Sequence, residues 1–237
     1  MEAYDMKRWN WTALFMLSLM VLTVSCRQLF TTSLGSALAR DGINIPSDAS
    51  IDELLEIAQG EYGSDPDVSK ELLDAFAEQD ADDLTDLSAD EKGAILNLAA
   101  SAAVDMDTLT DLGKKAGDDA YNSDDLVAEA FNSFDTSVDL TAIEILLADT
   151  NTIQTAPVDS IILAAAVVCA DVVAACGAGG STLVMEVLAG TQPVANLPDD
   201  QEARIQAIIA ARTELEKRPE TADLSFGDFK IIDFLKG

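Results

Sequence analysis

The side chains that could do chemistry in this chain are carboxylates and three thiols, because its 237 residues include 43 Asp and Glu but no histidine. Two acidic clusters stand out, within residues 80–91 and 118–125. Their members are Asp80, Asp82, Asp83, Asp86, Asp90 and Glu91, and then Asp118, Asp119, Asp124 and Asp125. Clustered carboxylates suggest calcium, which binds roughly six to eight oxygen ligands.

The first acidic cluster does not match a calcium loop. An EF-hand loop needs a ligand at its fifth position, glycine at its sixth and glutamate at its twelfth. Counted from Asp80, Glu91 is twelfth, but Leu84 and Thr85 occupy the fifth and sixth positions. Aspartates also complement the dipole at the start of a helix. We therefore interpret the clusters as solvated helix N-termini, and the sequence predicts no metal site and no cofactor.

The sequence also offers little support for an active site. Paired carboxylates can hydrolyse glycans, but such folds usually add aromatic rings that stack on sugar. After residue 26 the chain has no tryptophan and only two tyrosines, Tyr62 and Tyr121. The glycine-rich run 177–182 lacks the lysine and the preceding strand of a phosphate loop, so it predicts a tight turn between helices. We predict no catalytic residues and do not expect an enzyme.

Two of the thiols lie in one predicted helix. Cys169 and Cys176 are seven residues apart, which separates them by two turns and about 10 Å along the axis. That separation is too long for a disulfide within an intact helix. Without histidine or a CxxC motif, a zinc, haem or redox role has little support. We expect buried free thiols that behave as small apolar side chains.

The third thiol, Cys26, ends a segment with the layout of a secretory signal. Lys7 and Arg8 precede a nearly unbroken apolar run over residues 11–24, and the run stops at Ser25 and Cys26. A charged start, an apolar centre and a small residue at the cut define such a signal. Beyond the cysteine the chain becomes polar and acidic.

With a cysteine at the cut, this segment resembles the signal peptide of bacterial lipoproteins. The resemblance implies a signal peptide over residues 1–25 and a membrane attachment through lipid on Cys26. It places the protein in the cell envelope, facing the periplasm or the exterior. The lipobox is relaxed, because Leu22 is four residues before the cysteine and Thr23 does not fit. The alternative is an uncleaved anchor, although residues 11–26 supply 16 residues where a span needs about 20.

The charge of the chain limits its partners. Its formal net charge is −29, and residues 41–160 hold 30 acids but four lysines, namely Lys70, Lys92, Lys114 and Lys115. Such a field repels nucleic acid and anionic headgroups, so neither is an expected direct partner. Two interpretations stay open: a surface suited to a saline medium, where salt screens self-repulsion, and a docking face for a basic envelope protein. Disorder is not favoured, because apolar residues recur at helical spacing.

Helix signals recur through the acidic region. Capping boxes begin at Ser50 and Ser88, where a serine and a glutamate three residues later satisfy free helix amides. Other starts are expected at Asp65-Pro66, Ser123 and Asp139 or Thr141, with a shorter helix over 109–115 and an amphipathic one over 199–217. Apart from short pieces, no segment alternates like a strand. The sequence predicts an all-α fold, either a multi-helix bundle or an irregular helical stack.

The most apolar stretch of the predicted domain is Pro157 to Gly180. A helix over about 159–176 is apolar all round except at Asp171, which is typical of the buried centre of a domain. A second helix is expected from Thr182 to Ala189. The tail contains Phe226, Phe229, Ile232 and Leu235, which we expect to fold back onto the core. The predicted organisation is a signal peptide (1–25), a lipidated N-terminus with a tether helix (26–46) and an acidic all-helical domain (47–237).

Three functions follow as hypotheses. The first is a lipid-anchored scaffold or adaptor for envelope or transporter components, with an envelope protein as partner. The second is a helical binding protein that holds a small apolar ligand or lipid beside the 159–189 core. The third is a carboxylate-based hydrolase.

Overall fold

The computed structural model describes residues 45–46, 48–104, 129, 131–223, 225–226 and 229–230. These residues confirm the all-α prediction, since helices account for nearly all the regular structure and the two strands of the C-terminal hairpin are two residues each. The α-helices are α2 (Ile51–Gln59), α3 (Pro66–Ala77), α4 (Ala81–Thr85), α5 (Ala89–Ala103), α8 (Thr141–Ala148), α9 (Thr150–Thr155), α10 (Val158–Cys176), α11 (Gly180–Leu188), α12 (Asp199–Leu215) and α13 (Pro219–Asp223). Two 3-10 turns, η1 (Glu61–Ser64) and η2 (Val194–Asn196), and the strands β1 (Ser225–Phe226) and β2 (Phe229–Lys230) complete the order.

Local sequence signals position the first helices as predicted. The Ser50 and Ser88 hydroxyls accept the amides of Glu53 and Glu91 at 3.4 Å, and each glutamate accepts the serine amide at 2.8 Å. Asp65 caps α3 with its side chain. These reciprocal bonds satisfy helix amides that would otherwise lack partners, so the starts of α2, α3 and α5 are encoded locally.

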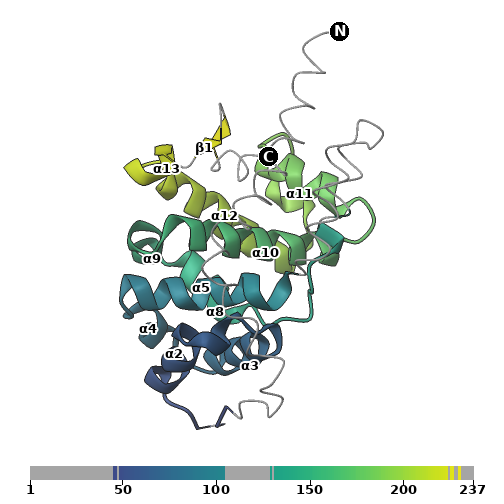
Figure 1. Cartoon of the computed structure of the whole chain (residues 1–237). Helices are drawn as coiled ribbons and strands as arrows, with labels where there is room; N and C mark the ends of the chain where they lie inside the picture. The colour runs from purple at the N-terminus through teal and green to yellow at the C-terminus, as the bar shows by residue number, and fades with distance from the viewer. Residues whose placement is uncertain are drawn as a thin grey trace.

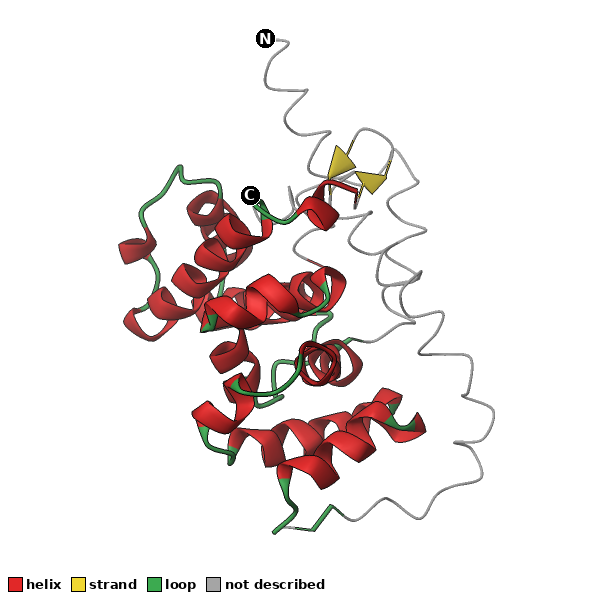
Figure 2. Ribbon diagram, turned by 90° about the vertical axis from the view of Figure 1, so that its left-hand side faces the viewer, coloured by secondary structure: helices red, strands yellow, loops and turns green. Residues whose placement is uncertain are grey.

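The helices form a stack, with α5 and α10 in its middle. Helix α5 packs against α3 on one side and α10 on the other, and α10 in turn packs against α11 and α12. Figure 1 shows this order from α2 and α3 at the bottom to α11, α12 and α13 at the top. Figure 2, turned by 90°, shows the same succession of helical layers. Helix α8 contacts α4 and α5 as well as α12, so it connects the lower layers of the stack to the upper ones.

Helix α10 is the buried centre that its sequence predicts. Among the described residues it is the single helix long and apolar enough to cross a membrane, with a mean hydropathy of 2.2, yet 78% of that window is buried inside the fold. Its buried side chains run from Val158 to Val173. Burial of this kind places the apolar helix against other helices, where it supplies much of the hydrophobic stabilisation.

Close packing between α5 and α10 depends on a glycine. A Cβ atom on Gly93 would lie 2.8 Å from Cδ of Pro157 and 3.8 Å from Oγ of Ser160. The absence of a side chain at Gly93 therefore lets the N-terminal half of α5 approach the start of α10. Alanines on both helices, including Ala99, Ala103 and Ala164, are buried, and small side chains favour the same close approach.

Some boundaries differ from the sequence prediction. Helix α11 begins at Gly180 rather than Thr182, and α12 ends at Leu215 rather than Lys217. The short helices α4, α9 and α13 were not predicted as separate elements. The helix expected over 109–115, most of the one after Ser123, nearly all of the 26–46 tether and the side chains of the C-terminal tail lie outside the described residues.

Candidate functional site

The predicted lipidation site, Cys26, lies outside the described residues, as does the acidic cluster over 118–125. The first acidic cluster is described and does not converge. Asp80 precedes α4, and the four other aspartates of the cluster (Asp82, Asp83, Asp86 and Asp90) are exposed. Within the described ranges, no group of three or more metal-ligating side chains comes together.

The two described thiols occupy different environments. Cys169 is fully buried, and burial raises its thiol pKa to about 12 despite the nearby charge of Arg204. Cys176 is half-buried, and burial together with the negative charge of Asp200 raises its pKa as well. A thiol with a raised pKa is a poor nucleophile at neutral pH. The geometry agrees with the expected free thiols, although Cys176 is less enclosed than expected.

The glycine-rich run forms the turn between α10 and α11. Gly177 and Gly179 have φ angles of 67° and 83°, a left-handed region that favours glycine. A Cβ atom on Gly180 would lie 2.3 Å from the carbonyl oxygen of Val173. These glycines are needed to reverse the chain and pack α11 onto α10, in line with the predicted helix–helix turn.

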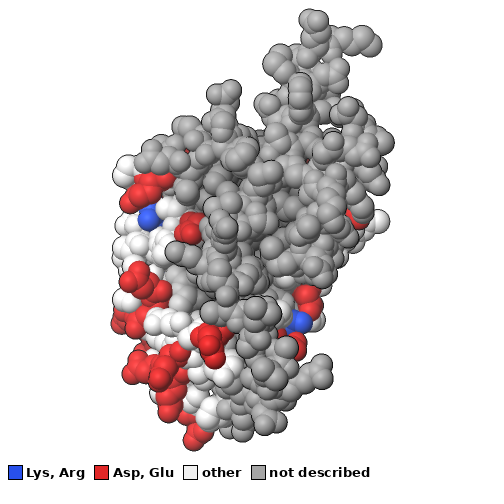
Figure 3. Space-filling model, in the orientation of Figure 1, with Lys and Arg blue, Asp and Glu red and all other residues white. Residues whose placement is uncertain are grey.

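The most distinctive surface is a set of exposed carboxylates around α2, α3 and α4, which we call the acidic end. Its members are Asp48, Asp52, Glu53, Glu56, Glu61, Asp67, Glu71, Asp74, Glu78, Asp80, Asp82, Asp83, Asp86 and Asp90. Figure 3 shows such side chains gathered at the lower left, where Figure 1 places α2 and α4. The charges therefore face solvent from several helices rather than meeting in one site.

Neither lysine between residues 48 and 92 neutralises this surface. Lys70 is half-buried and donates to Asp135 at 2.5 Å. Its hydrogen bond, with those from Ser137, lowers the Asp135 pKa to about 2. Lys92 is completely buried. Both cations are used for contacts within the fold, so the acidic end keeps nearly its full negative charge.

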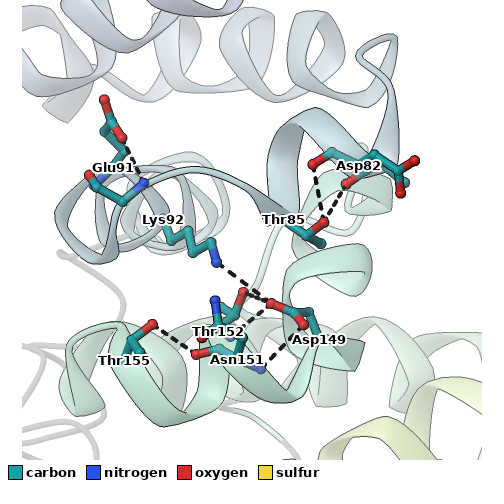
Figure 4. A network of polar contacts seen from close by, with 10 residues as sticks. Asp82, Thr85, Glu91, Lys92, Asp149, Asn151, Thr152 and Thr155 are labelled. Carbon is teal, nitrogen blue, oxygen red and sulfur yellow. Dashed lines mark hydrogen bonds and ion pairs between the residues drawn. The ribbon is translucent and has the colours of Figure 1, made fainter.

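Lys92 points from α5 to the joint between α8 and α9 (Figure 4). Its Nζ lies 3.6 Å from Oδ2 of Asp149, and it makes no hydrogen bond within the described part of the chain. Asp149 also caps α9, because its carboxylate accepts the amides of Asn151 and Thr152 and the Thr152 hydroxyl. Burial would raise the Asp149 pKa, but these bonds and the Lys92 charge outweigh it and lower the pKa.

A second cation, Arg204, whose side chain is 13% exposed, joins three helices. Its Nη1 donates to Asp171 of α10 at 2.6 Å and to Gln201 at 2.8 Å, and its Nε lies 2.7 Å from Glu144 of α8. Burial raises the Glu144 pKa, Arg204 opposes that shift, and the charges of Asp171 and Asp139 add to it. This arrangement explains how α10 tolerates a charged residue in its middle, since Asp171 faces a guanidinium.

Sequence reasoning did not find these two ionic contacts. A signal was present for Lys92, which precedes Ile95, Leu96 and Ala99 by three, four and seven residues and therefore lies on the apolar face of α5. Asp171 was recognised as the exception in an apolar helix, but its partner Arg204 is 33 residues away. Only the packing of α12 on α10 identifies that pair.

Comparisons of the chain with known protein families, curated proteins and solved structures found no match. The described geometry offers ionic contacts between helices and a charged surface. Neither has the convergent groups of a catalytic centre.

Proposed function

We propose that this protein is a lipid-anchored envelope protein whose helical domain acts as a scaffold or adaptor through its acidic end. The observation that carries the proposal is the burial of α10. The single described helix of membrane length is enclosed by the rest of the fold, so it is not available as an anchor. Membrane attachment then falls to the N-terminal segment that ends at Cys26.

The acidic end supports the adaptor part of the proposal. Its carboxylates come from successive helices at one end of the stack, and the two lysines in this part of the chain pair with Asp135 and Asp149. A surface of one sign attracts a partner of the opposite sign and repels like-charged surfaces. The partner of this end is accordingly a basic protein surface rather than nucleic acid or an anionic membrane.

The anchor is tested by expressing the full chain in a bacterium that processes lipoproteins and labelling it with palmitate. The unchanged chain should be labelled and recovered with membranes, whereas Cys26→Ala should lose both properties. Cys176→Ala is the matched control, because it removes a half-buried thiol and should keep both. Label that persists in Cys26→Ala would contradict the assignment at this residue.

The adaptor role is tested by cross-linking in cells followed by purification under conditions that retain lipid. Neutralising three exposed acids of the acidic end, with Glu56→Gln, Asp74→Asn and Glu78→Gln, should remove a cross-linked basic protein. A control with Asp159→Asn, Glu186→Gln and Glu202→Gln removes the same charge elsewhere and should retain it. Partner capture that is equal in both variants, or a bound lipid without a partner, would contradict the adaptor role.

A further inference from the structure

The short helix α9, which lies between the core helices α8 and α10, has little local support for its helical conformation. Its six residues lie between two extended joints, Asp149 with ψ 115° and Ala156 with ψ 158°. An isolated helix of this length is unstable in water. Four of the six residues are exposed, and Thr152 and Ile153 are buried. Contacts from other elements must therefore hold α9 in place.

A cation from another part of the fold engages each end of α9. At its start, Lys92 of α5 pairs with Asp149 (Figure 4). At its end, Nη1 of Arg218, which follows α12, donates to the carbonyl oxygens of Ile153 at 2.9 Å and Ala156 at 2.6 Å. The side chain of Arg218 is 14% exposed. We call these two contacts, Lys92 with Asp149 and Arg218 with the carbonyl oxygens, the fastenings of α9. They link α9 to α5 below it and to the C-terminal helices above it, and α9 also packs against α5 and α12.

The neighbouring helices have cores of their own. Helix α8 buries Ala142, Ile143, Leu146 and Leu147, and α10 is buried along most of its length. Loss of the α9 contacts would leave both helices packed against α5 and α12. Elements with few buried apolar contacts open locally at a lower free energy than the whole fold.

We propose that residues 149–156 form a strap that opens as one unit, without global unfolding, and that this opening exposes the buried ammonium of Lys92. The apolar side chains that the strap buries are Ile153 and Ala156, and the charged groups at its two ends add to this burial. Weakening either fastening loosens the other end, because the segment between them is too short to stay helical alone.

Acylation of lysines in the full chain, followed by mass spectrometry of each site, tests the strap. Lys92 is completely buried, so its labelling requires opening, and Lys70 serves as the reference. Arg218→Met removes the fastening at the far end and should raise the Lys92 rate at least about tenfold, as expected from losing charged hydrogen bonds. The Lys70 rate should stay unchanged, and low denaturant should have little effect on the Lys92 rate.

A matched control separates the strap from general loss of stability. Val184→Ala in α11 removes buried side-chain volume on an element that does not contain the strap. If Lys92 labelling rises equally in Val184→Ala and Arg218→Met at equal global stability, the proposal is overturned. Should Arg218→Met not fold, the denaturant dependence in the unchanged chain decides. A flat Lys92 rate at low denaturant supports the strap, and a rate that follows global unfolding overturns it.

Discussion

Between Asp48 and Asp90 most carboxylates face solvent and the one lysine, Lys70, pairs with Asp135, whereas in the C-terminal part Arg204 and Arg218 bind carboxylate and carbonyl oxygens of neighbouring elements. Arg204 joins α8, α10 and α12, and Arg218 holds the end of α9. The first arrangement leaves charge available to solvent or a partner. The second uses charge to connect helices that apolar packing alone would orient less specifically.

Lys92 connects these two regions. It belongs to the lysine-poor N-terminal half, yet its ammonium pairs with Asp149 in the C-terminal half. A buried cation near the start of α5 is unfavourable both for desolvation and for the helix dipole. The contrast shows why the acidic end keeps its negative charge. Lys70 and Lys92, the two lysines nearest to it, pair with Asp135 and Asp149 outside the acidic end.

The largest expected effect comes from removing the charge partner of Lys92. Asp149→Asn keeps a capping side chain for α9 but leaves a buried ammonium without its carboxylate, which should cost about 3 kcal/mol in the free energy of unfolding. Lys92→Met leaves Asp149 with its hydrogen-bond donors and should cost within about 1 kcal/mol. Urea unfolding measures both. Equal losses in the two variants would show that the pair is not the reason for the Asp149 effect.

The packing of α5 against α10 at Gly93 should give the next largest effect on stability. In an exposed helix position Gly→Ala stabilises by about 1 kcal/mol, but here a Cβ would lie 2.8 Å from Pro157. We expect Gly93→Ala to lower the free energy of unfolding by about 1–3 kcal/mol through overpacking. Asn97→Ala, in the same helix, is the control and should be near neutral or stabilising. Stabilisation by Gly93→Ala would mean that α5 and α10 are less tightly packed than described.

The acidic end should make stability depend on salt. Raising NaCl from low to molar concentration screens its self-repulsion, so the midpoint of thermal unfolding should rise. The Glu56→Gln, Asp74→Asn, Glu78→Gln variant should be more stable at low salt by about 1 kcal/mol in total, with a smaller response to NaCl. If unfolding of the unchanged chain does not respond to salt, adaptation to a saline medium fails as an explanation and the acidity needs a functional one.

The smallest effect concerns the Lys70–Asp135 pair. Because the folded-state pKa of Asp135 is about 2 against an ordinary value of 3.8, its contribution is present above about pH 4 and is lost as pH falls toward 2. Both side chains are a third or more exposed, at 33% and 40%, so screening keeps the contribution below about 1 kcal/mol. Unfolding against pH should be shallower in Asp135→Asn over this range. An unchanged slope would show that the pair contributes nothing.

The helical class and several helix starts were predictable because their causes are local. The Ser50 and Ser88 capping boxes require residues three apart, and the apolar character of residues 158–176 is continuous along the chain. The N-terminal signal is likewise a local pattern, so the lipidation prediction at Cys26 rests on sequence and remains a prediction.

The sequence by itself determined that the chain is helical, acidic and built around one apolar helix, because these properties depend on composition and on neighbours within a few residues. Only the tertiary structure decided which cations lie inside the fold and pair with carboxylates of other helices. Lys92 meets Asp149 across 57 positions and Arg204 meets Asp171 across 33, so both pairs depend on which helices pack together. Packing of this kind is a property of the whole core, and no short window of sequence contains it.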